Sequence, residues 1–98
     1  QKAFYHSLCV LTGNFPQLLW KEALPALHAL QIPDNAFATY IHQVSENFIL
    51  QKENSVTGPF VRKDFQTIEN NLAALSEQKT KSSEKLKNIY SAFMKEFI

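Results

Sequence analysis

The sequence predicts an all-α protein: a four-to-five-helix bundle that forms a single domain over residues 1–98. Apolar residues recur at steps of three and four along most of the chain, which is the spacing of one helix face. No segment alternates apolar and polar residues for long enough to predict a β-strand. A chain of this length is also too short to hold two separate hydrophobic cores.

The first segment, residues 3–30, is the most apolar part of the chain. It carries only two charged residues, and its apolar residues lie all round the predicted helix. Such a helix is surrounded by protein on most sides, and a chain of this size cannot surround it alone. The segment therefore predicts a partner surface, either a second copy or another domain. Because Pro16 and Pro25 each remove a backbone donor, we expect this long first helix to be kinked or broken near residues 13–16.

Three later stripes of apolar residues predict three further helices. Asp34, directly after Pro33, is the expected N-cap of the first of them, and Asp64 is the expected N-cap of the second. We expect the polar residues 76–83 to form an exposed loop before the third. The three stripes consist of Phe37, Tyr40, Ile41, Val44 and Phe48; of Phe65, Ile68, Leu72 and Leu75; and of Leu86, Ile89, Tyr90, Phe93, Met94, Phe97 and Ile98.

Composition excludes several functional classes. The two glycines, Gly13 and Gly58, lie far apart, so this chain cannot form a Gly-rich loop for nucleotide phosphates. Ten basic against nine acidic residues give no basic stripe, so we expect no nucleic-acid partner. Cys9 is the single cysteine, which excludes an internal disulfide and favours a reducing, cytoplasmic location. The uncharged stretch at residues 3–20 contains polar residues and a proline, so we expect no membrane span.

The loop before the Asp64 helix is the first candidate binding site. Gly58 can adopt a backbone conformation that other residues avoid, and Pro59 fixes the next φ. Asp64 then begins a helix whose free N–H groups favour a nearby anion. With the Thr57 hydroxyl and the Arg62 guanidinium, such a loop can hold an acidic ligand. The alternative is a structural turn in which Arg62 pairs with Asp64 or caps a preceding helix end.

His6 and Asn14 form a second candidate pair on the apolar first helix. A polar group in such surroundings must find a partner. The alternative is a satisfied core histidine at His6 and a helix-breaking turn at Asn14. No nucleophilic triad can be assembled, since His6, Ser7 and Cys9 have no nearby carboxylate. His6 and Cys9 share a helix face, but no further ligands follow at helical spacing, so we predict no metal site.

Two stretches, Phe4–Phe15 and Val56–Asp64, resemble one family. It is the Rossmann-like, oxidoreductase-related family whose C-terminal domain is of unknown function. Its signature reads roughly Tyr-His with a downstream Asn, then Leu-Thr-Gly-Pro-x-x-Arg-Gly-Asp, then Thr-x-x-x-x-Leu-x-Ala-Leu. Lys63 stands where the family usually has Gly. The last motif is matched here by Thr67, Leu72, Ala74 and Leu75.

This resemblance implies a helical domain like the C-terminal domain of 6-phosphogluconate dehydrogenase. In such proteins an N-terminal Rossmann domain binds NAD or NADP, and the helical domain dimerises and closes the substrate cleft. The implied partners are a second copy and the chain's own Rossmann domain, which would precede Gln1. The implied cofactor is NAD or NADP, bound by the longer parent protein of which this chain would be the C-terminal domain, and none is implied for this chain. The implied site residues are His6 and Asn14 on the first helix and Thr57, Gly58, Pro59 and Arg62 in the loop at the cleft edge.

Two functional hypotheses follow. In the first, the chain is the helical dimerisation and substrate-cleft domain of an NAD(P)-dependent oxidoreductase, inert by itself because it lacks a site for the hydride carrier. In the second, it is a free-standing helical interaction module whose apolar face docks a partner helix. A Gly-x-Gly-x-x-Gly strand–turn–helix upstream of Gln1 would decide for the first. We expect self-association through residues 3–30.

Overall fold

The computed structural model describes all of residues 1–98, and its backbone is helical with no strand. The prediction of an all-α fold with four long helices is therefore confirmed. The first long helix comprises α1 (Lys2–Cys9), the π-helical turn η1 (Val10–Asn14) and α2 (Phe15–Ala29). The remaining elements are α3 (Asp34–Gln51), the 3₁₀ turn η2 (Lys52–Ser55), the short α4 (Pro59–Arg62), α5 (Phe65–Glu77) and α6 (Lys81–Phe97).

The first helix runs for 28 residues and is not broken at Pro16. Pro16 has no N–H to donate to the carbonyl of Thr12, which an uninterrupted α-helix requires. The π-helical turn η1 lies directly before this position, and the Phe15 N–H donates to the carbonyl of Val10, five residues back. Of the two alternatives expected near residues 13–16, a kink or a break, the break is wrong, and so is the helix-breaking turn at Asn14, because the backbone changes its hydrogen-bond spacing and continues. The first helix is long, as expected.

The two predicted N-caps have different outcomes. Asp64 is confirmed, since its Oδ1 accepts from the N–H of Thr67 at 3.1 Å. The prediction that Asp34 is an N-cap is wrong. The helix α3 begins at Asp34 itself, its N-cap is Pro33, and no side chain caps the helix. The Asp34 carboxylate instead lies 2.6 Å from Nε2 of His28 at the exposed corner between α2 and α3. The Asp34 carboxylate therefore contacts His28 of the preceding helix and does not cap α3.

The predicted loop at residues 76–83 is shorter than expected. Only residues 78–80 lie outside the helices. Thr80 is the N-cap of α6 and forms a capping box with Ser83, in which each side chain bonds the other residue's N–H, at 3.0 and 3.1 Å. A hydroxyl-rich segment that reads as a loop therefore also contains the start of the last helix.

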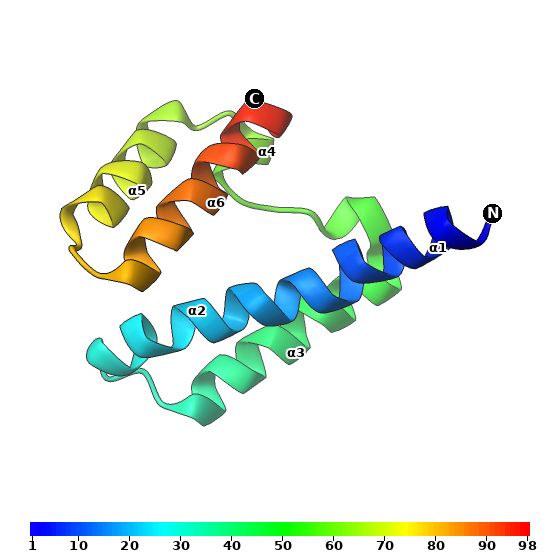
Figure 1. Ribbon diagram of the computed structural model, residues 1–98, viewed down its shortest axis with the longest axis horizontal. Helices are drawn as coiled ribbons and strands as arrows, with labels where there is room; N and C mark the ends of the chain where they lie inside the picture. The colour runs from blue at the N-terminus through cyan, green and yellow to red at the C-terminus, as the bar shows by residue number, and fades with distance from the viewer.

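The helices form two antiparallel pairs (Figure 1). In one pair α5 packs on α6, with α4 against α5; the other consists of the long first helix and α3. The two pairs meet where α2 packs on α6, and Lys85 Nζ lies 3.3 Å from Glu22 Oε1 across this junction. Between α2 and α3 a cavity of about 300 Å³ remains, lined by Trp20 and Phe37 among others. None of the helices is both long and apolar enough to cross a lipid bilayer.

The fully buried core of one chain consists of two residues. Ile68 is 1% exposed and Ser83 is 6% exposed. A closed single-chain protein of 11.2 kDa exposes about 5,700 Å², whereas this chain exposes 8132 Å². The helices of one chain are thus present as predicted but do not close into a bundle around a shared core. The large side chains left exposed on the first helix are Phe4, Tyr5, Leu8, Leu11, Phe15, Leu18 and Leu19, and Leu30 directly after the helix is exposed too.

Replacement of the one buried apolar residue should be costly. We expect Ile68→Ala to lower the free energy of unfolding by about 2–5 kcal/mol, because it leaves a cavity at the buried face of α5. Glu69→Ala, at the exposed neighbouring position, is the control and should change it by less than about 0.5 kcal/mol. Urea unfolding followed by circular dichroism measures both. Equal midpoints for the two variants would contradict the assignment of the core to Ile68.

Candidate functional site

An apolar groove of about 950 Å³ lies between α2 and the α4–α6 unit. Eleven of its fourteen lining residues are hydrophobic, and none carries a charge. Leu19 contributes from α2, and the segment from Val56 to Val61 forms one wall. The lining residues of α5 and α6 are Asn71, Ala74, Leu75, Leu86, Ile89, Tyr90, Phe93 and Phe97.

The loop that forms this wall has the backbone that the sequence predicts. Gly58 has a φ of 109°, which side-chain-bearing residues rarely adopt. Pro59 then begins α4, and the N–H of Asp64 closes the turn by donating to the Pro59 carbonyl at 2.9 Å. Lys63 ends α4 in the left-handed conformation, with φ 56° and ψ 40°. Glycine is favoured in this conformation, and Lys63 is the position at which the resembled family has Gly.

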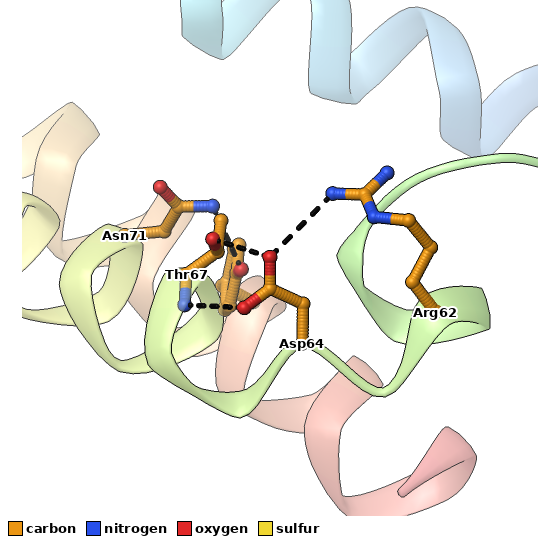
Figure 2. Close-up of polar contacts among 5 residues, drawn as sticks. Arg62, Asp64, Thr67 and Asn71 are labelled. Atoms are coloured by element: carbon orange, nitrogen blue, oxygen red, sulfur yellow. Dashed lines mark hydrogen bonds and ion pairs between the residues drawn. The ribbon is translucent and has the colours of Figure 1, made fainter.

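Asp64 organises the polar contacts at the end of this loop (Figure 2). Its Oδ2 accepts from the Thr67 hydroxyl at 2.7 Å, and its Oδ1 accepts from the Thr67 N–H. Arg62 Nη2 lies 3.7 Å from Oδ2. The two hydrogen bonds from Thr67, with a smaller effect of the Arg62 charge, hold the pKa of Asp64 below its ordinary value of 3.8.

These contacts correct one expectation and leave another open. The Thr67 N–H at the start of α5 is occupied by the chain's own Asp64 carboxylate, so the expected anion position at this helix terminus is already filled. Arg62 pairs with Asp64, as the structural interpretation of the loop expects. Its side chain is nevertheless 59% exposed and makes no other ion pair or hydrogen bond, so most of its donors remain accessible.

Asn71 and Tyr90 belong to the site, and sequence reasoning missed them as a pair. Asn71 Nδ2 donates to Tyr90 Oη at 3.1 Å, joining α5 to α6. The Phe60 ring meets the Tyr90 ring edge-on, with centroids 5.6 Å apart. The groove thus has one hydrogen-bonded polar pair in its wall, in addition to Thr57. Tyr90 was assigned only to an apolar stripe, and no local pattern links it to a residue 19 positions away.

His6 and Asn14 are not brought to this loop by a single chain. Both are exposed, on α1 and η1 respectively, and neither lines the groove. Neither side chain makes a hydrogen bond or an ion pair within the chain. The interpretation of His6 as a satisfied core histidine is therefore wrong for one chain. No group of three or more His, Cys, Asp or Glu side chains is placed to hold a metal ion.

The Asp64 cap predicts a pH-dependent stability. A carboxyl whose pKa is lowered by folding stabilises the protein above its unfolded pKa, and this contribution is lost as the pH falls through the folded value. We expect Asp64→Ala to lower the urea midpoint at pH 7, and the difference from the original chain to vanish well below pH 3.8. Glu69→Ala, which removes an unpaired carboxylate on the same helix, should show no such pH-dependent difference. A pH-independent effect of Asp64→Ala would contradict the account.

Comparison with known proteins gives one match. The family model described as "Domain of unknown function (DUF2520)" matches residues 1–97. No curated protein and no solved structure matches the chain. The matched range includes α1, the groove-lining loop with Gly58 and Arg62, and all of α6. The chain therefore belongs to the DUF2520 family of domains of unknown function.

Proposed function

We propose that this chain is the helical dimerisation and substrate-cleft domain of an NAD(P)-dependent oxidoreductase, with a fold like the C-terminal domain of 6-phosphogluconate dehydrogenase. The observation that carries the proposal is the exposed apolar surface. One chain exposes about 2,400 Å² more than a closed chain of its mass would, and the large apolar side chains left exposed include Phe4, Leu8 and Leu11 of the first helix. Surface of this extent and apolar character is typical of a protein completed by another.

The loop motif supports the enzymatic part of the proposal. Thr57, Gly58, Pro59 and Arg62 match the signature of the oxidoreductase-related family. Thr57 and Pro59 line the apolar groove, and Gly58 and Arg62 belong to the same loop. The Arg62 guanidinium is accessible and can form paired hydrogen bonds to an oxyanion, so it is the group that would pair with an acidic substrate or a cofactor phosphate. With two distant glycines, this chain has no phosphate loop of its own, so the nucleotide is held by another domain of the parent.

Self-association is the first test. We expect the chain to sediment as a dimer at micromolar concentration and Leu11→Glu to shift it toward monomer. Leu11 is 53% exposed in one chain, so a charge there costs little unless a partner covers it. Glu69→Lys, an exposed substitution on α5, is the control and should leave the dimer intact. A strictly monomeric original chain would refute the dimerisation role.

Arg62 provides the second test, in the intact parent protein. We expect Arg62→Ala to raise the Michaelis constant for the acidic substrate or the phosphate-bearing cofactor by about tenfold or more, because a charge-assisted hydrogen bond is lost. Lys63→Ala removes the neighbouring cation and should have little effect. Arg62→Lys should restore part of the binding. Unchanged kinetics in Arg62→Ala would exclude a binding role for this side chain.

A free-standing helical interaction module is the alternative that the same exposed surface supports. Its apolar groove would dock a partner helix, and no nucleotide domain would accompany it. Nucleotide binding by the intact parent protein separates the two functions. Binding of NAD or NADP supports the oxidoreductase, and its absence supports the interaction module.

A further inference from the structure

Two features of the chain are unpartnered and complementary. The first is the segment α1–η1, in which every residue of α1 is exposed, including Phe4, Tyr5 and Leu8. The second is the groove of about 950 Å³ between α2 and the α4–α6 unit. Figure 1 shows α1 at the free end of the long first helix, away from the α5–α6 pair.

The exposed helix needs a cover that its own chain does not provide. The segment α1 is the first part of a 28-residue helix, and most of the stability of a helix in a protein comes from tertiary packing rather than from its length. In proteins such a segment is stabilised by packing of its apolar face. Here that packing is missing within the chain, although the segment carries Phe4, Leu8 and Leu11.

The groove matches this segment in charge and chemistry. None of its lining residues is charged, and residues 3–20, which include η1 and all of α1 except Lys2 at its start, carry no charge either. An amphipathic or apolar helix lying in an apolar groove is a recurring mode of protein recognition. A charged occupant would lose its hydration in this groove without gaining an ionic partner.

The excess exposed surface area of one chain indicates that the helix in the groove comes from a second copy. If each of two chains covers its excess of about 2,400 Å², the dimer buries about 4,800 Å² in total, within the range of obligate homodimers. A two-fold axis applies every contact twice, so one arrangement covers both α1 segments and both grooves. Each copy supplies what the other lacks.

We propose that α1 and η1 of each chain lie in the α2/α4–α6 groove of a second copy, so that the candidate site is completed across the dimer. His6 and Asn14 of one copy then lie beside the Thr57–Arg62 loop of the other, which a single chain does not achieve. This arrangement rests on the dimerisation in the proposed function, and it specifies which surfaces of the two copies are in contact.

The single native cysteine makes the arrangement testable. Cys9 lies on α1 and is exposed, and Val61 lines the groove. The original chain is mixed with Cys9→Ser/Val61→Cys, the two are unfolded and refolded together, and a short bismaleimide crosslinker is added. Because each chain then has only one thiol, any Cys9-to-position-61 crosslink joins two copies. Peptide mapping by mass spectrometry identifies the linked positions.

We expect the crosslink between positions 9 and 61 to form in this mixture. It should be lost when the second chain is Cys9→Ser/Glu69→Cys, whose thiol lies on α5 outside the groove. Circular dichroism checks that each variant is helical, and Thr57→Cys replaces Val61→Cys if the latter does not fold, since Thr57 lines the same wall.

The outcomes separate this proposal from the proposed function. A dimer in sedimentation that gives no crosslink between positions 9 and 61, or only Cys9-to-Cys9 crosslinks, overturns the docking of α1 and leaves dimerisation standing. A chain that stays monomeric overturns both. Crosslinking at position 69 as efficient as at the groove position also overturns the docking, because it shows contact without a preferred site.

Discussion

Burial of the uncharged first helix is the constraint on which the rest of the structure depends. Residues 3–20 carry no charged group, so water solvates this helix poorly. Within one chain, the α2 part packs on α6 and lies along α3, and all of α1 is exposed. The α4–α6 unit holds Ile68, the single buried apolar residue, so it is the part of the chain that comes nearest to closing on itself. The remaining apolar surface stays exposed in one chain, and the proposed second copy would cover it.

The sequence predicted the features of the fold that are set by neighbouring residues. Helical spacing located all four long helices, and Asp64 caps α5 through a contact only three residues away. The sequence-based prediction was wrong where a more distant contact or a change in backbone hydrogen bonding set the local structure. His28, six residues earlier, holds the carboxylate of Asp34 in place of a cap. Before Pro16 the chain forms a π-helical turn at Val10–Asn14, which the residue pattern did not distinguish from a break.

The same division applies to the candidate site. Thr57, Gly58, Pro59, Arg62 and Asp64 are contiguous, so the sequence predicted them as one loop, and the positive φ of Gly58 agrees with its expected role. The Asn71–Tyr90 hydrogen bond depends on how α5 packs on α6 and therefore had no local signal. His6 and Asn14 remain apart from the loop in one chain. Their placement depends on a surface that the sequence of one chain suggests but does not position.

Hydrogen exchange of the α1 amides at different protein concentrations tests most directly whether a second copy covers the first helix. The account predicts that these amides exchange slowly in concentrated solution and rapidly after dilution below the dissociation constant of the dimer. Amides of α5 near Ile68, which pack within one chain, should change less on dilution. Rapid exchange of α1 at every concentration would contradict the account, because it would show that no second chain covers this helix.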